Sequence, residues 1–411
     1  GAACAYPLEK QNDPNHPLFK EEDMYPAHPE SSYGWGKLMG EYECELYSKT
    51  GLLDTSILRL HNVYGPHSDL SPEKSDERNS FKDVLLEKRL TNSLKRLNPW
   101  ISDENLRKVV RALISTQYTN LVEANQSIWE TLNQCVSVQQ DLGKGNKGQT
   151  LHIIDFENPE NNEFLCSNQF KVEGPQQNII PDIVLFVNGL PLGVIECKSP
   201  YINNPMEAGI TQLLRYANRR EPSHNEGAEK LFYYNQMMIS THRDKARVGT
   251  ITSLYEHYLE WKDPYPLSSE QVSDNPTSQE LMIAGLFNKT NFLDVVQNFI
   301  VFEPVDGRVL KKMTRYQQFR AVHKSIHRIK TGADRKEKSG VIWHTQGSGK
   351  SLTMVFLTLK IRRDPELRDY KLVFLTDRTQ LDSQLTTTFR NTQNETVRHA
   401  DSVKSLKKLL A

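Results

Sequence analysis

The chain has 411 residues, of which 37% are hydrophobic and 25% charged, and its acidic and basic side chains are equal in number. This suits a globular protein of two or three domains and excludes a chain that is basic throughout. With no run of ~18 apolar residues and no secretory leader, and with five scattered cysteines that lack a C-x-x-C pair, we expect a cytoplasmic protein without membrane partner, disulfide framework or zinc site.

Residues 1–66 differ in pattern from the rest. Tyr33 and Lys37 fall one turn apart in a predicted helix, and ILRLHNVYGP predicts a strand that enters a turn. The piece resembles part of an extended short-chain dehydrogenase, of the NAD-dependent sugar-nucleotide epimerase group that includes GDP-mannose 3,5-epimerase. The resemblance implies hydride chemistry by Tyr33 and Lys37 and an acid-base role for Cys4. The Gly-rich loop for the NAD pyrophosphate does not occur, so we expect a fused fragment that binds no NAD.

Residues 67–134 predict helices. Leucines at helical spacing from Leu85 to Leu97 stop before Pro99, Ser102 begins a second helix, and 118–132 form a third that carries Glu123. Beyond them, LHIIDF at 151–156, NQFKVEG at 168–174 and FYYNQMMISTH at 232–242 predict strands.

The stretch PDIVLFVNGLPLGVIECKSP at 181–200 holds two apolar runs around Asn188 and Gly189, a strong hairpin signal. A strict two-residue turn leaves Asp182 opposite Ile195, whereas one extra residue in the turn, a bulge that Pro191 makes plausible, brings it opposite Glu196. Opposed carboxylates repel, and a divalent cation between them removes the repulsion. Oxygen ligands suit Mg²⁺, and Lys198, two residues on, can position or deprotonate a water or offset phosphate charge.

The next helix has a clear start. Asn204 predicts an N-cap, Pro205 the first helical position and Glu207 the end of a capping box. Gln212 and Tyr216 then lie at i and i+4 on one face.

Pro181, Asp182, Glu196 and Lys198, followed by Gln212 and Tyr216, resemble the PD-(D/E)xK nuclease core and Q-x-x-x-Y extension of the R (restriction and motor) subunit of type I restriction-modification enzymes. The resemblance covers about residues 67–411. It implies that Asp182 and Glu196 bind Mg²⁺, that Lys198 is catalytic, and that Gln212 and Tyr216 support cleavage and DNA contact. Glu123 is the candidate for a helical acidic residue that assists the metal site.

Residues 262–280 hold three prolines and predict a linker. Two helices are expected at 280–287 and 291–299, followed by a segment at 308–338 with eleven Lys or Arg. This segment fits either phosphate neutralisation or a solvated helix face.

The stretch VIWHTQGSGKSLTMVFLTLK predicts a strand, a Gly-containing turn and a helix. Gly347, Ser348, Gly349, Lys350 and Ser351 match a P-loop, in which backbone amides and the lysine hold phosphates and the hydroxyl of Ser351 binds Mg²⁺. His344 replaces the first glycine of the motif.

The same part of the chain resembles a superfamily 2 helicase. Arg315, Tyr316 and Gln317 are similar to its Q motif, which reads adenine, and KLVFLTDRTQLDSQL is similar to motif Ia, a strand and loop at DNA. No Walker B acid pair, second RecA-like domain or arginine finger occurs before Ala411, so we expect ATP to bind weakly without turnover.

These observations predict an α/β chain. Its domains are the epimerase-like fragment 1–66, N-terminal helices and a PD-(D/E)xK mixed sheet at 67–261, a connector at 262–300 and an incomplete RecA-like domain at 301–411. The expected function is the N-terminal part of a type I restriction R subunit, an ATP- and Mg²⁺-dependent endonuclease that is inactive as this chain alone. Double-stranded DNA and the methylation and specificity subunits are the expected partners. The alternatives are a nucleotide-sugar epimerase or a non-catalytic ATP- and DNA-binding fragment.

Overall fold

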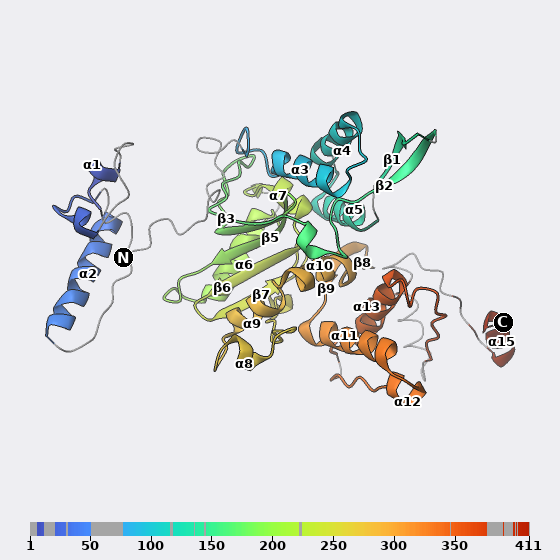
Figure 1. The fold of residues 1–411 in the computed structure, drawn as a ribbon. Helices are drawn as coiled ribbons and strands as arrows, with labels where there is room; N and C mark the ends of the chain where they lie inside the picture. The colour runs from blue at the N-terminus through green and yellow to red at the C-terminus, as the bar shows by residue number, and fades with distance from the viewer. Residues whose placement is uncertain are drawn as a thin grey trace. The chain divides into compact units, whose positions relative to one another are not determined.

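A computed structural model describes residues 6–11, 21–29, 32–50, 77–115, 118–134, 136–143, 145–221, 224–345, 347–375, 389, 398, 400 and 402–410. The chain divides into two compact units, Gly1–Ser68 and Asp69–Ala411 (Figure 1). Among the described residues, no helix is both long and apolar enough to cross a bilayer.

The first unit is small and helical. It contains α1 (Leu8–Gln11), the 3-10 helix η2 (Glu21–Met24) and α2 (Ser32–Lys49). Tyr6, Met24 and Leu38 form its buried cluster, and Lys10 Nζ lies 2.9 Å from the Asp23 carboxylate. Tyr33 and Lys37 lie on α2 as expected, whereas Cys4 and the strand expected at 57–66 fall outside the described residues.

The second unit contains the elements on which the candidate sites are built. In its first part these are α3 (Glu87–Leu97), α4 (Asp103–Ser115), α5 (Leu121–Gln134), β1 (Val136–Asp141), β2 (Asn146–Leu151), η3 (Pro159–Asn161), β3 (Phe164–Asn168), β4 (Ile183–Val187), β5 (Leu190–Cys197), α6 (Pro205–Tyr216), α7 (Glu229–Tyr234), β6 (Met237–His242) and β7 (Lys245–Gly249). There follow η5 (Tyr255–His257), α8 (Ser269–Val272), α9 (Ser278–Gly285), α10 (Lys289–Asn298), β8 (Ile300–Val305), β9 (Arg308–Met313), α11 (Tyr316–Thr331), α12 (Arg335–Lys338), α13 (Lys350–Arg363) and α15 (Val403–Leu410).

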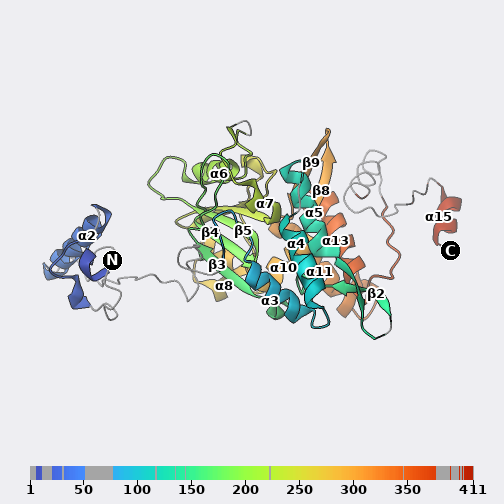
Figure 2. The ribbon, with the colours of Figure 1, turned by 90° about the horizontal axis from the view of Figure 1, so that it is seen from above.

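A five-stranded mixed sheet lies at the centre of this unit, in the order β3-β4-β5-β6-β7. Strands β5 and β6 are parallel, and the other neighbours are antiparallel. The crossover from β5 to β6 contains α6 and α7, and α6 packs against both strands. The expected mixed sheet with flanking helices is therefore present (Figures 1 and 2).

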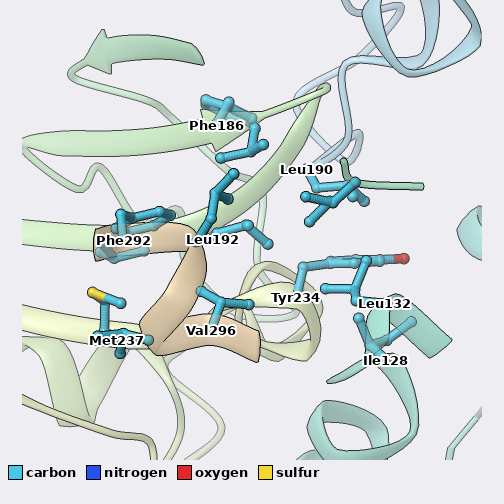
Figure 3. Close-up of a cluster of buried hydrophobic side chains, with 14 of the residues drawn as sticks. Ile128, Leu132, Phe186, Leu190, Leu192, Tyr234, Met237, Phe292 and Val296 are labelled. Atoms are coloured by element: carbon cyan, nitrogen blue, oxygen red, sulfur yellow. The ribbon is translucent and has the colours of Figure 1, made fainter. Parts of the chain in front are cut away.

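One apolar core joins this sheet to helices that come before and after it in the sequence. Figure 3 shows part of it, with Ile128 and Leu132 of α5, Phe186, Leu190, Leu192 and Met237 of the sheet, Tyr234 of α7 and Phe292 and Val296 of α10. Helix α9 packs on β7, and Ser278 bonds to both backbone groups of Ala246. The connector after the expected linker is therefore part of the sheet's core.

Three helices precede the sheet, as predicted, and Leu90 and Leu94 of the leucine stripe are buried. Three strand predictions were wrong in part. Residues 152–156 continue β2 as irregular chain, only Asn168 of the strand expected at 168–174 lies in β3, and the segment from Phe232 begins as helix α7 before β6. Tertiary burial decides these cases, because short apolar runs do not distinguish a buried strand from a buried helix.

The turn of the central hairpin is buried beneath α3. Asn188 is fully buried. Its side-chain Nδ2 donates to Ile153 O at 2.9 Å, and its side-chain Oδ1 accepts from Glu163 N at 2.8 Å. Gly189 O accepts from Leu86 N at 3.0 Å. Asn188 and Gly189 both have positive φ, 51° and 81°, as a tight hairpin turn requires.

A buried lysine ties the β8-β9 hairpin to the same core. Lys311 Nζ donates to Asn125 Oδ1 (2.7 Å), Gln236 Oε1 (2.9 Å) and Asn235 O (3.1 Å). Burial lowers the pKa of Lys311 well below its usual value. Its described acceptors are all uncharged oxygens from α5 and the turn before β6, so this contact joins three segments that are distant in sequence.

We predict that Gly189→Ala destabilises the second unit by about 3 kcal/mol, the sum of a left-handed backbone penalty and a steric clash. An added Cβ would lie 2.6 Å from Leu86 O and 2.8 Å from Leu90 N. Gly307 is the matched control, because its φ is also positive (74°) while its Cβ would meet no atom within 4 Å, and Gly307→Ala should cost only about 1 kcal/mol. Urea denaturation measures both losses, and equal losses would contradict this packing.

Candidate active site on the central hairpin

A β-bulge brings the two candidate carboxylates together. Leu185 pairs with Gly193 and Phe186 with Pro191, so Leu192 is the extra residue on β5. The pairing of Ile183 with Ile195, continued by one residue, places Asp182 opposite Glu196. The expectation of an extra residue in the turn was wrong: Val187 pairs with Leu190, so the turn keeps two residues, and the extra residue lies within β5 next to Pro191.

Asp182 is fixed from two sides. Its Oδ1 accepts from Gln169 Nε2 and its Oδ2 from the backbone N–H of Cys197, both at 2.8 Å. The carboxylate therefore has a defined orientation just before the start of β4, next to Cys197 of β5.

Glu196 is buried, with 1% of its surface exposed. Its Oε1 accepts from Lys198 Nζ at 2.6 Å, and its Oε2 is buried without a hydrogen-bond partner among the described residues. Burial raises the pKa of Glu196 to about 7, the charge of Asp182 also raises it, and the bond from Lys198 opposes this. An unpaired buried oxygen of this kind is costly unless a ligand or proton satisfies it.

Lys198 is held by a chain of hydrogen bonds from α6. Besides Glu196, its Nζ donates to Gln212 Oε1 at 2.6 Å, and Gln212 Nε2 donates to Tyr216 Oη at 2.5 Å. Tyr216 Oη donates in turn to Ile180 O at 3.2 Å, just before Asp182. The structure thus brings together Asp182, Glu196, Lys198, Gln212 and Tyr216.

Helix α6 lies very close to the sheet at this point. A Cβ on Gly209 would lie 2.2 Å from Ser240 Oγ and 3.4 Å from Lys198 Cγ, so a larger residue would require Ser240 to move. Helix α6 begins at Pro205 as predicted, but the capping box is absent: Asn204 has φ 48° and its side chain makes no cap bond. An N-cap residue normally has an extended backbone, which Asn204 lacks.

An open groove runs along α6 next to Gln212. It is lined by Asn203, Asn204, Glu207, Thr211, Gln212, Arg215 and Arg220. Because Gln212 also bonds Lys198, a ligand in the groove would reach the edge of the carboxylate cluster.

The donor atoms of this site fit Mg²⁺. No group of three or more His, Cys, Asp or Glu side chains within the described ranges could hold a metal ion. Mg²⁺, however, characteristically uses one or two carboxylates and takes its other ligands from water and phosphate. Asp182 and Glu196, with the unpaired Oε2, supply that minimal set.

Glu123 lies apart from these contacts. It is exposed in the first turn of α5, where its N–H donates to Asn120 Oδ1 at 2.9 Å and its carboxylate accepts from Thr119 and Asn120. None of these bonds reaches the carboxylate pair, and they describe a helix cap.

The residues predicted to form a P-loop, 347–351, lie in a turn and in the first turn of α13, which begins at Lys350. Gly347 and Gly349 have φ of 77° and 80°, and Lys350 Nζ donates to His344 O and Thr345 O at 3.0 and 2.9 Å. Ser348 is buried, and Ser351 lies in the first turn of the helix.

The structure places Gln318, the neighbour of Gln317, against this loop, and the adenine contact expected of Gln317 stays a prediction. Gln318 Nε2 donates to Gly349 O at 2.9 Å and to Ser348 O at 3.3 Å. Gln317 lines a separate cleft with Arg315, Tyr316 and Arg247, and its Oε1 is buried without a partner among the described residues. The sequence offers both glutamines side by side, and only the helical phase of α11 distinguishes them.

The strand expected before the P-loop is absent. Residues 341–345 and 371–375 have no regular structure, and Val341 and Trp343 are each 93% exposed. Strands need hydrogen-bonded neighbours, and no described strand pairs with either segment. A RecA-like parallel sheet is therefore not formed by the described residues.

A half-buried cluster of charged and polar side chains connects α10 to α11 and α13. Asp294 accepts from Lys360 Nζ of α13 at 2.6 Å and from His323 Nε2 of α11 at 2.7 Å. Burial would raise the pKa of Asp294, but the bond from His323 and the charge of Lys360 hold it at about 2. Helices α10, α11 and α13 lie side by side in Figures 1 and 2.

Three family models match the chain. Residues 60–257 match the type I restriction enzyme R protein N terminus, and residues 317–411 match the SWI2/SNF2 ATPase. Residues 1–93 match the NAD dependent epimerase/dehydratase family, so this likeness extends beyond residue 66 and overlaps the first model.

Two relatives support the same assignment. A putative type I restriction enzyme MjaIXP endonuclease subunit of Methanocaldococcus jannaschii is 30% identical over 87% of this chain and 35% of its own length. The type I restriction enzyme HindI endonuclease subunit of Haemophilus influenzae is 31% identical over 81% of this chain and 32% of its own length. The chain thus spans about a third of the length of these curated relatives, and its resemblance to the R subunit is confirmed.

We predict that Glu196 makes stability fall as pH rises in metal-free buffer. Its folded pKa of about 7 lies above the ordinary 4.5, so between these values the unfolded state releases a proton that the folded state keeps. The free energy of unfolding is therefore lower by about 3 kcal/mol above pH 7, and this loss is absent below the ordinary pKa of a glutamate.

Glu196→Gln should therefore be more stable than the natural chain at pH 8 and equal to it near pH 4.5. Thermal melts across this range measure the difference, with the exposed Glu157→Gln as the matched control. A stability difference that does not change with pH would contradict the buried, proton-retaining carboxylate.

Proposed function

We propose that the chain is the N-terminal part of the R subunit of a type I restriction enzyme and carries its Mg²⁺-dependent DNA endonuclease domain. One observation carries the proposal: Asp182, Glu196 and Lys198 converge where β4 begins and β5 ends, and Glu196 there keeps a buried oxygen without a partner among the described residues. A purely structural hairpin would have no use for two opposed carboxylates in a partly buried position.

Asp182 and Glu196 are the residues that would hold Mg²⁺. Bound there, the cation would supply Lewis acidity at the phosphodiester and lower the pKa of a water. Its binding also requires an ionised Glu196, so affinity should rise as pH approaches 7 from below.

Lys198 acts on the reacting groups. Its ammonium group is held by Glu196 and Gln212 and can orient the attacking water or offset the charge that develops on a phosphate oxygen. Gln212 fixes the direction of Lys198, and Tyr216 fixes Gln212. The groove along α6, with Arg215 and Arg220, gives the DNA backbone an approach to these groups.

The P-loop supplies the start of an ATP-binding module. Lys350 would contact the β- and γ-phosphates, Ser351 the accompanying Mg²⁺, and the amides of Gly347, Ser348 and Gly349 the phosphate oxygens. ATP-driven translocation belongs to the complete R subunit. Double-stranded DNA and the methylation and specificity subunits are the proposed partners.

Glu123 stays a candidate for an acidic residue that assists the metal, and the finer domain limits also stay predictions. The expected lack of NAD binding by residues 1–66 likewise stays a prediction.

We predict that Lys198→Ala lowers the rate of DNA cleavage about 10²–10³-fold, as loss of one charge-stabilising donor does, and leaves DNA affinity within about twofold. Because this chain alone is expected to be inactive, cleavage is measured with the substitution in a complete R subunit that is assembled with its methylation and specificity subunits and supplied with ATP and Mg²⁺, as conversion of supercoiled plasmid to nicked and linear forms. A gel shift of the chain itself in Ca²⁺ measures binding. Lys147→Ala, on the exposed ribbon β1-β2, is the matched control and should behave as the natural chain.

Cleavage by Lys198→Ala at the natural rate would refute the assignment. Intact DNA binding by the chain, without metal-dependent cleavage by the complete assembly, would instead favour the alternative, a fragment that binds ATP and DNA without catalysis.

A further inference from the structure

Gln169 has a backbone conformation that its side chain does not favour. It follows β3 directly and has φ 48°, in the left-handed region. Of the seven described non-glycine residues with positive φ, five are Asn or Asp, the types that tolerate this region. A glutamine there carries a conformational cost that glycine would avoid.

The neighbouring residues hold Gln169 in this conformation. Phe170 is buried, with its ring 5.2 Å from that of Phe186 and the Arg78 guanidinium 4.0 Å above it. The backbone N–H of Phe170 donates to Pro181 O at 3.1 Å. This anchored aromatic ring fixes the chain on one side of Gln169, and β3 fixes it on the other.

The result is a double contact between Gln169 and Asp182. The backbone N–H of Gln169 donates to Asp182 O, and its side-chain Nε2 donates to Asp182 Oδ1, each at 2.8 Å. Since Cys197 N–H donates to Oδ2, each carboxylate oxygen has one fixed donor and keeps a lone pair for another partner.

A merely structural role would not require the side chain. The backbone bond already closes the end of the sheet, and a strained non-glycine residue persists where its surroundings enforce it, often at functional sites. Here the enforced conformation aims an uncharged donor at the carboxylate that faces Glu196. An uncharged donor orients Asp182 without competing as a counter-ion for the charge that attracts a cation.

We propose that Gln169 is a positioning residue that holds the Asp182 carboxylate in the orientation that binds a divalent cation. This inference rests on the proposed endonuclease function. It adds a residue that lies outside the Asp, Glu-x-Lys and Gln-x-x-x-Tyr motifs.

Two variants separate the hydrogen bond from the backbone cost. Gln169→Met keeps the length of the side chain and the conformational cost of positive φ but removes the hydrogen-bond donor. Gln169→Gly removes the donor and the conformational cost together. Titration of the full chain with Mn²⁺, followed by calorimetry, measures binding without relying on cleavage. We expect each variant to bind Mn²⁺ about tenfold more weakly, the effect of losing one hydrogen bond to a charged group. The Gly variant should melt at the same or a higher temperature than the Met variant.

A kinetic readout adds an independent check. In the complete assembly with ATP, cleavage by Gln169→Met should return toward the natural rate when Mg²⁺ is raised about tenfold, whereas cleavage by Lys198→Ala should not. A structural defect would lower the rate at every Mg²⁺ concentration, and that result would overturn the inference.

Asp182→Asn distinguishes failure of this inference from failure of the proposed function. If Asp182→Asn abolishes Mn²⁺ binding while Gln169→Met and Gln169→Gly bind as the natural chain does, Gln169 has no positioning role and the metal site stands. If Asp182→Asn binds Mn²⁺ normally, the proposed metal site is refuted and this inference with it.

Discussion

Two carboxylates on facing strands, one of them buried, set the main constraint on this molecule. Glu196 is removed from water, faces Asp182 and leaves one oxygen without a partner among the described residues. Burial and like charge both disfavour its ionised form. The fold around it limits the cost: the Leu192 bulge sets the register, Gly209 admits α6, and Lys198 neutralises one oxygen. A cation is the remaining element that would balance the charge of the pair.

The same core that supports this pair also reaches the P-loop helix. Phe292 and Val296 of α10 are buried in the core of the sheet, while Asp294 of the same helix bonds His323 of α11 and Lys360 of α13. These contacts are half-buried, with 10% of the Asp294 side chain and 20% of the Lys360 side chain exposed. Helix α10 therefore connects the central sheet to α13, the helix that follows the glycine-containing turn.

Local patterns in the sequence were enough to predict much of the site. Asn-Gly marked the hairpin, the charged residues at its ends marked Asp182, Glu196 and Lys198, and helical spacing placed Gln212 and Tyr216 on one face. Features that depend on distant contacts were not predictable. Gln169 meets Asp182 only through the pairing of β3 with β4, the contact of Gln318 with Gly349 depends on the phase of α11, and the strand expected at 341–343 lacks a described neighbour to pair with.

Anomalous diffraction from a crystal of the chain grown with Mn²⁺ tests the central claim most directly, because it locates the cation without reference to activity. The account predicts one anomalous peak between the carboxylates of Asp182 and Glu196, at ~2.0–2.3 Å from an oxygen of each, with Lys198 within hydrogen-bond distance of the cation's water ligands. The peak should vanish in Asp182→Asn. A fully ordered hairpin without a peak there, or a Mn²⁺ ion bound only elsewhere, would contradict the claim that these residues form the metal centre of an endonuclease.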